Sequence, residues 1–149
     1  MTRETVTSAS ADQTRQLAAA LTCRFRRGDL VLLSGDLGAG KTTFVQGLAT
    51  ALRVAQRVQS PTFTIVAEYT GELAREPVRL IHIDLYRLAP GPELESAGIE
   101  DYFDCDDCLT VIEWPDRVAS LPGERTWRIT LAESGAEERQ ITIEEPAFA

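Results

Sequence analysis

The chain has 149 residues, of which 44% are hydrophobic, and a formal net charge of −8. This size predicts a single domain spanning residues 1–149, while the negative charge argues against broad or stable direct binding to nucleic-acid phosphates, which depends on Lys and Arg. No apolar run approaches the length of a membrane span and no apolar signal segment is seen, so we expect no membrane association and a cytoplasmic location.

The N-terminal segment is expected to form a short strand, a helix and a core strand. Residues around Val6 fit an edge strand. Ser10 and Gln13 have the S-x-x-Q spacing of a capping box, which predicts a helix start. The apolar face of this helix is expected to contain Leu17, Ala20 and Leu21. The continuous apolar run over 30–34 then predicts a strand that is buried on both faces.

A glycine-rich loop, Gly35–Thr42, follows this strand and fits G-x-x-x-x-G-K-[ST], the phosphate-binding loop of P-loop NTPases. Lys41 is the only lysine, since the other fourteen basic residues are arginine. The glycine spacing does not fit the G-x-G-x-x-G of dinucleotide-binding folds. A glycine-rich turn with an incidental lysine is the alternative. The amphipathic helix that follows favours the phosphate loop, and its apolar positions are Val45, Leu48, Ala49 and Leu52.

The chemistry of such a loop assigns roles to these residue types. Glycines allow backbone N–H groups to form a concave nest around an anion, and the helix N-terminus adds a positive dipole end. Lys41 is expected to bridge the β- and γ-phosphates, and the Thr42 hydroxyl to ligate Mg²⁺. The nucleotide contacts expected from this loop are Asp36, Gly38, Ala39, Gly40, Lys41, Thr42 and Thr43.

The middle of the chain predicts a polar loop and several further elements. Thr62 and Thr64 follow Pro61, and their hydroxyls suit a sensor of γ-phosphate or Mg²⁺, although turn hydrogen bonding suits them nearly as well. The next expected elements are a strand, a hairpin-type connection, a second strand and a short helix, at 65–69, 70–77, 79–84 and 90–98.

Two acidic residues that end apolar strands compete for the metal side of the site. Asp84 ends the strand over 79–84, and Glu113 ends a strand over 108–113. If both strands flank the loop strand, one acid could ligate the metal while the other polarises water or supports a switch loop. The alternative for either acid is a strand end that faces solvent. His82 shares a strand face with Asp84, where a hydrogen-bonded structural role is the simpler expectation.

An acidic run and three cysteines each allow more than one interpretation. Residues 88–116 contain nine carboxylates and no basic residue, which indicates either a solvated face or a docking surface for a basic partner. Cys23, Cys105, Cys108 and His82 could form a zinc site, and C-x-x-C spacing also occurs in redox pairs. No second close pair supports zinc, and Cys108 leads into a strand instead of a helix, so we expect reduced, structural thiols.

The C-terminal region has the pattern of an antiparallel hairpin that covers the end of the sheet. Ser134 and Gly135 separate two segments of alternating apolar residues, at Trp127, Ile129, Leu131, Ile141 and Ile143. Together these elements predict an α/β protein. We expect a P-loop NTPase-like three-layer fold, with a central, mostly parallel sheet, flanking helices and the C-terminal antiparallel hairpin.

Four segments together resemble the bacterial TsaE (YjeE) family, namely Gly35–Phe44, Ser60–Thr64, His82–Leu88 and Glu113–Pro115. The resemblance runs from about residue 12 to Pro115, whereas the C-terminal hairpin matches only in general pattern. This family is the small ATPase of the tRNA threonylcarbamoyladenosine pathway. The resemblance implies ATP, Mg²⁺ and work with TsaD and TsaB, which modify adenosine 37 of tRNAs that read codons beginning with A.

The resemblance also implies individual site residues. Lys41 and Thr42 would hold phosphate and Mg²⁺, Glu113 would be the metal-side acid, and Asp84 would be a catalytic or switch carboxylate. The N-terminal segment would help to hold the adenine, without a residue that can be assigned. The other implied site residues are Thr62, Thr64 and Trp114.

Three further nucleotide-dependent functions can be weighed against this one. A GTPase is disfavoured because the guanine-reading N-K-x-D motif needs asparagine, which this chain lacks. A small-molecule P-loop kinase would need an acceptor pocket and usually an arginine-bearing lid over the phosphates. Arg87 is a candidate contact, but no arginine-rich lid stands out in the sequence. A nucleotide-dependent scaffold without turnover would use the acidic run as its functional surface.

Overall fold

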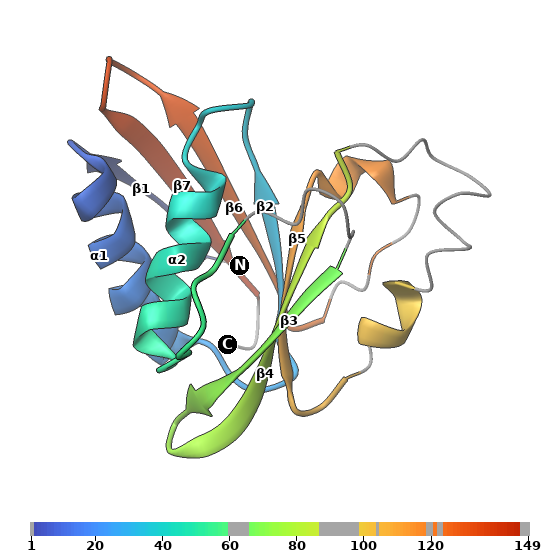
Figure 1. Cartoon of the computed structure of the whole chain (residues 1–149). Helices are drawn as coiled ribbons and strands as arrows, with labels where there is room; N and C mark the ends of the chain where they lie inside the picture. The colour runs from blue at the N-terminus through green and yellow to red at the C-terminus, as the bar shows by residue number, and fades with distance from the viewer. Residues whose placement is uncertain are drawn as a thin grey trace.

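A computed structural model describes residues 2–59, 66–86, 99–103, 105–118, 121 and 124–146. A seven-stranded sheet with the order β1-β7-β6-β2-β5-β4-β3 forms its centre (Figure 1). The strands are β1 (Thr2–Ser8), β2 (Leu30–Ser34), β3 (Val66–Leu73), β4 (Glu76–Asp84), β5 (Cys108–Glu113), β6 (Thr126–Glu133) and β7 (Arg139–Glu145). No helix within these ranges is long and apolar enough to cross a bilayer.

The sheet is mixed, which corrects the expectation of a mostly parallel one. Strands β6, β2, β5 and β4 pair in parallel, while β1 with β7, β7 with β6, and β4 with β3 pair antiparallel. The C-terminal hairpin does not cover the sheet's end, because β6 pairs directly with β2. Trp127, Ile129 and Leu131 of β6 are thereby buried on the same side as Val31 and Leu33 of β2.

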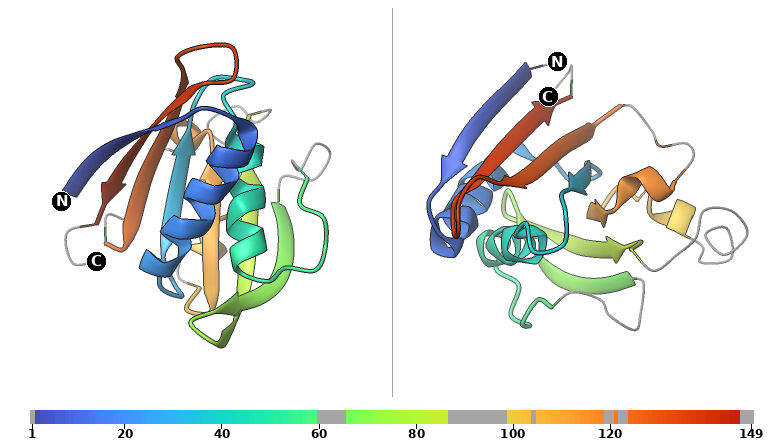
Figure 2. Two further views of the ribbon diagram at one scale, coloured as in Figure 1. Left: turned by 90° about the vertical axis from the view of Figure 1, so that its left-hand side faces the viewer. Right: turned by 90° about the horizontal axis from the view of Figure 1, so that it is seen from above.

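Two helices pack side by side on one face of the sheet (Figure 2). They are α1 (Ala11–Leu21) and α2 (Lys41–Ala51). Ser10 caps α1 as predicted, because its side chain accepts a hydrogen bond from the Gln13 backbone N–H at 3.2 Å. Ala18, and not Ala20, is the buried alanine of this helix. Val45, Leu48, Ala49 and Leu52 are all buried, as expected for the helix after the loop.

Among the described residues, the opposite face of the sheet carries only short 3₁₀ helices. The flanking α-helices that the three-layer expectation requires are therefore confirmed on one face only. These are η2 (Ile99–Tyr102) and η3 (Pro115–Arg117), whereas η1 (Thr22–Arg24) extends α1 (Figure 1). Side chains in and next to η2 and η3 pack against an apolar cluster around Leu32, Ile83 and Ile112. The helix expected at 90–98 lies outside the described residues.

The hairpin of β3 and β4 is longer than expected. A two-residue turn at Ala74 and Arg75 connects the strands, and both residues have positive φ. The predicted connection over 70–77 therefore consists largely of strand residues. Gly71 lies within β3, where a Cβ would come within 2.4 Å of the Leu52 carbonyl oxygen at the end of α2, so this position favours glycine.

Strand order positions the two candidate acids next to each other. Strand β5 lies between β2 and β4, so only β5 flanks the loop strand on this side, which corrects the expectation that both acidic strands could flank β2. Asp84 pairs in register with Glu113, and Glu113 with Leu33. Parallel pairing thus brings both carboxylates to the edge of the sheet where the glycine loop leaves β2.

Candidate functional site

The glycine loop connects β2 to the N-terminus of α2. Gly40 precedes the helix in a left-handed conformation, with φ 102°, which side chains rarely adopt. The Ala39 N–H donates to the Asp36 carbonyl at 3.0 Å, and the Phe44 N–H donates to the Gly40 carbonyl at 2.9 Å. The first N–H groups of α2 are therefore left for an anion at the helix start.

A cavity of about 300 Å³ lies against this loop, and most of the predicted site residues surround it. Its lining consists of Leu37, Gly38, Gly40, Lys41, Thr42, Thr43, Asp84, Tyr86, Glu113 and Trp114. Asp36 and Ala39 are not part of the lining; Asp36 is exposed to solvent and Ala39 is buried. Thr62 and Thr64 lie outside the described residues.

Lys41 is held at the floor of the cavity and is only 5% exposed. Its Nζ donates to the Gly35 carbonyl at 2.6 Å and lies 4.0 Å from the centroid of the Trp114 ring. Burial lowers the pKa of Lys41, while the nearby charges of Glu113 and Asp84 oppose that shift. A poorly hydrated ammonium interacts more strongly with a phosphate than one in bulk water.

Glu113 is 3% exposed and is paired with a buried histidine. The Nε2 of His82 lies 2.5 Å from Glu113 Oε2. An ionised carboxylate only accepts hydrogen bonds, so Nε2 donates. The hydrogen-bonded role expected for His82 is confirmed, and its partner is the candidate metal-side acid. His82 Nδ1 has no hydrogen-bond partner in the described part of the chain.

Asp84 and two aromatic residues form the wall of the cavity beyond Glu113. Asp84 is half-buried, and its Oδ1 accepts a hydrogen bond from the Tyr86 N–H at 3.0 Å. The rings of Tyr86 and Trp114 pack with centroids 5.0 Å apart. Trp114 has a left-handed backbone conformation, with φ 60°, directly after β5. This turn directs its indole over Lys41.

Arg139 supports the loop from β7 and was not found from the sequence. Its Nε donates to the Ala39 carbonyl at 3.1 Å and its Nη2 to the Gly38 carbonyl at 3.2 Å. The residue is a hundred positions from the loop and belongs to no motif, so only the three-dimensional structure reveals it.

A second cavity of about 200 Å³ lies on this side of the loop, lined by Ala11, Thr14, Gly38, Gly40, Thr43, Glu137 and Arg139.

The cysteines do not form the zinc site that was considered. Cys105 and Cys108 are joined by a disulfide, which corrects the expectation of reduced thiols, because the turn between them brings their Cα atoms to 5.4 Å. Cys23 is exposed and free, and His82 pairs with Glu113 instead.

Comparison with known proteins decides the family. The model of the family described as "Threonylcarbamoyl adenosine biosynthesis protein TsaE" matches residues 8–141. The chain belongs to the TsaE family. The match to TsaE includes the glycine loop, both acids and most of the C-terminal hairpin, so the hairpin that bears Arg139 belongs to the family region as well.

Individual TsaE relatives agree with this assignment. A Bacillus subtilis (strain 168) protein named "tRNA threonylcarbamoyladenosine biosynthesis protein TsaE" is 37% identical, covering 89% of this chain and 79% of the relative. A Treponema pallidum protein of the same name is 38% identical, covering 91% and 96%. The crystal structure of Bacillus subtilis YdiB superposes with a TM-score of 0.76 at 29% identity, covering 99% of this chain and 88% of that one.

Proposed function

We propose that this protein is a Mg²⁺-dependent ATPase that acts in the threonylcarbamoyl modification of adenosine 37 in tRNAs reading codons that begin with A. The observation that carries the proposal is the convergence of Lys41, Thr42, Asp84 and Glu113 around one cavity beside the glycine loop. The relatives named for threonylcarbamoyladenosine biosynthesis supply the pathway. The P-loop NTPase-like character of the fold is part of the same proposal.

The donor set of the cavity suits Mg²⁺, a hard cation that prefers oxygen ligands. The Thr42 hydroxyl and the carboxylates of Glu113 and Asp84 are all in the lining. Thr42 and Glu113 are the proposed Mg²⁺ ligands, and Asp84 lies next to Glu113 in the register of β4 and β5. When bound, Mg²⁺ would neutralise charge on the β- and γ-phosphates of ATP.

The chain's own residues have distinct tasks in this proposal. Lys41 stabilises the charge that develops on the transferred phosphoryl group, and the Trp114 ring shields its ammonium from water. Asp84 orients the attacking water or couples the site to the segment that contains Thr64. His82 is a positioning residue, because its hydrogen bond fixes the orientation of the Glu113 carboxylate.

The second cavity suits the nucleoside half of ATP. It shares Gly38, Gly40 and Thr43 with the first cavity, so a molecule that crosses the loop can occupy both. Its outer wall comes from the start of α1 and from the β6–β7 turn, at Ala11, Thr14 and Glu137. In this proposal these residues contact the adenine, for which the sequence alone does not indicate a binding residue.

The partners in this proposal are TsaD and TsaB. A chain with a net charge of −8 is poorly suited to bind tRNA phosphates by itself, so the modification requires other subunits to hold the RNA. Glu100, Asp101, Asp106 and Asp116 of the acidic run are exposed and suit a basic partner, whereas Glu113 of the same run is buried in the site.

Phosphate release from ATP tests the proposal, measured with and without a TsaD–TsaB complex. Lys41→Ala is expected to reduce turnover by at least about 100-fold, because one preorganised donor to the transition state contributes that much. Near-normal turnover of this variant would exclude the phosphate-loop assignment. Phosphate transfer only to an added small acceptor would favour a kinase, and binding without turnover under all conditions would favour a scaffold.

A further inference from the structure

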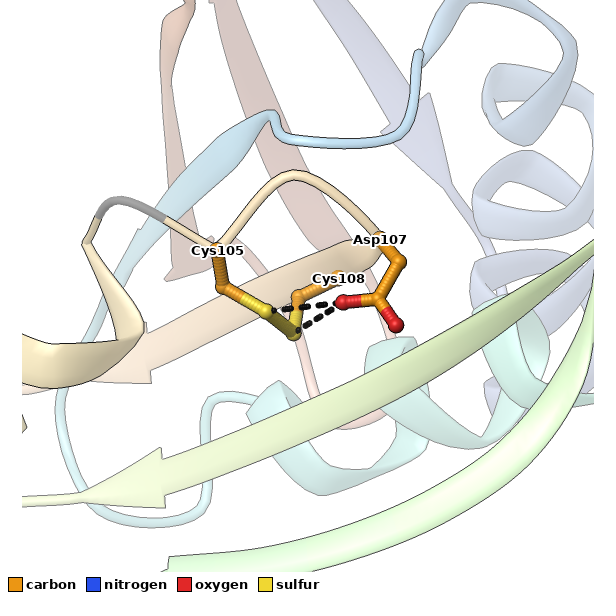
Figure 3. Close-up of side chains that lie close together, drawn as sticks. All are labelled: Cys105, Asp107 and Cys108. Carbon is orange, nitrogen blue, oxygen red and sulfur yellow. Dashed lines mark hydrogen bonds between the residues drawn. A yellow bond between two sulfur atoms is a disulfide. The ribbon is translucent and has the colours of Figure 1, made fainter.

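A second cluster of reactive side chains lies at the opposite end of β5 from Glu113. Cys105 and Cys108 form a disulfide there, and the Asp107 carboxylate lies against both sulfurs (Figure 3). Strand β5 runs from Cys108 to Glu113, so at about 3.3 Å per residue its ends are roughly 17 Å apart. The cluster is therefore separate from the proposed nucleotide site.

The polar contacts of this cluster favour the reduced form of the pair. Asp107 Oδ1 lies 3.1 Å from Cys105 Sγ and 3.7 Å from Cys108 Sγ. A disulfide sulfur has no hydrogen to donate to this oxygen, whereas a thiol does. The Arg79 Nη2 lies 3.1 Å from Cys105 Sγ, where a guanidinium stabilises a thiolate.

Arg79 also keeps the carboxylate ionised. Its Nη2 donates to Asp107 Oδ1 at 3.2 Å, and this hydrogen bond holds the pKa of Asp107 below its ordinary value. At neutral pH the acceptor is therefore present for either thiol. The same two side chains thus stabilise the products of reduction more than the disulfide itself.

Burial distinguishes the two sulfurs. Cys108 is fully buried, while Cys105 is only partly buried and lies next to exposed residues Asp106 and Asp107. An attacking thiolate therefore meets Cys105 Sγ first. The ring closed by the disulfide spans only the turn from Cys105 to Cys108, so it constrains little of the unfolded chain and its opening is compatible with an intact core.

We propose that Cys105 and Cys108 form a reversible thiol–disulfide site that exchanges two electrons with small thiols. A thiolate attacks Cys105 Sγ and forms a mixed disulfide, while the electron pair of the broken S–S bond goes to Cys108 Sγ, which takes up a proton. A second thiolate attacks the small-thiol sulfur of the mixed disulfide and releases the Cys105 thiolate beside Arg79. The two small thiols leave as one oxidised disulfide.

Glutathione is the probe for this proposal, with the full chain in a Cys23→Ser background so that only the pair can react. The protein is equilibrated in mixtures of reduced and oxidised glutathione, trapped with an alkylating reagent, and weighed by mass spectrometry. We expect two thiols to appear together as the mixture becomes more reducing and to disappear on return, with an unchanged circular dichroism spectrum.

Asp107→Asn tests the assigned cause, with Asp106→Asn as the matched control. Loss of the charged acceptor should raise the ratio of disulfide to dithiol several-fold in a fixed glutathione mixture, and the Asp106 variant should not change it. Two free thiols in the most oxidising mixture would overturn the proposal. So would a disulfide that is reduced only after unfolding, or bound zinc that keeps both thiols reduced. An unchanged ratio of disulfide to dithiol in Asp107→Asn would show that Asp107 does not favour the reduced form of the pair.

Discussion

His82 donates a hydrogen bond to Glu113, and we expect loss of this bond to disturb the orientation of the Glu113 carboxylate without weakening the binding of ATP. Glu113 sits in a nearly solvent-free position and receives its hydrogen bond from an equally buried ring. A carboxylate without this donor is free to rotate away from the geometry that a metal requires. His82 is fully buried and does not itself line the cavity.

On the proposal that Glu113 ligates Mg²⁺, His82→Phe is expected to lower kcat for ATP about 10- to 100-fold, the usual loss on removing a hydrogen-bond partner of a metal ligand, while the KM for ATP changes little. His82→Gln should restore most of the activity, because its amide N–H can donate to Glu113 in place of Nε2. Steady-state kinetics over a range of Mg²⁺ concentrations provide the measurement. A glutamine variant as inactive as the phenylalanine variant, with both folded, would show that the histidine acts through packing alone.

At the scale of elements, the loop is supported by a side chain from the far end of the chain. Arg139 of β7 donates to two consecutive loop carbonyls, which holds the loop in one conformation before a ligand arrives. Arg139→Gln should weaken ATP binding about 10-fold, since charged hydrogen bonds contribute about 1.5–3 kcal/mol each and part is recovered in the complex. Isothermal calorimetry measures this change, with the exposed Arg128→Gln on β6 as a control. Equal affinity in the two variants would contradict a supporting role.

The contact between α1 and α2 depends on a residue without a side chain. A Cβ at Gly47 would lie 2.4 Å from the Arg15 carbonyl oxygen, so the helices must separate to accommodate it. Gly47→Ala is therefore expected to destabilise the fold by about 1–3 kcal/mol despite the higher helix propensity of alanine. Urea unfolding measures the loss, and Thr50→Ala, on an exposed position of α2, is the comparison. A stabilised Gly47→Ala protein would mean that the helices are less closely packed.

These elements also show where reasoning from the sequence succeeds. The loop around Lys41 and the strand ending in Glu113 were predictable because motif, apolar run and helix period agree locally. The place of β4 beyond β5 was not, since strand order is decided by tertiary packing and leaves no local signal. Arg139 is not predictable for the same reason, because the pairing of β7 brings it to the loop without any local motif. Cys105 and Cys108 do share a C-x-x-C motif, but the expectation that a redox pair precedes a helix argued against the disulfide that forms before β5.

For the whole molecule, the site lies where several separate parts of the chain meet, so ligand binding and stability are linked. The two cavities together draw on α1, the loop, α2, β4, β5 and β7. A ligand that binds only when these elements are assembled stabilises the folded state by RT ln(1 + [L]/Kd). At 100 times Kd this amounts to about 2.7 kcal/mol.

We therefore expect saturating ATP with Mg²⁺ to raise the melting temperature by about 5–10 °C, because each kcal/mol shifts a domain of this size by about 2–4 °C. Differential scanning fluorimetry measures the shift. Lys41→Ala should show no shift at the same ATP concentration. Glu113→Gln should show a shift that depends less on Mg²⁺, because the carboxylate proposed to ligate Mg²⁺ is lost while Lys41 remains. An equal shift for wild type and Lys41→Ala would place ATP elsewhere on the molecule, since a site that needs Lys41 cannot stabilise a chain without it.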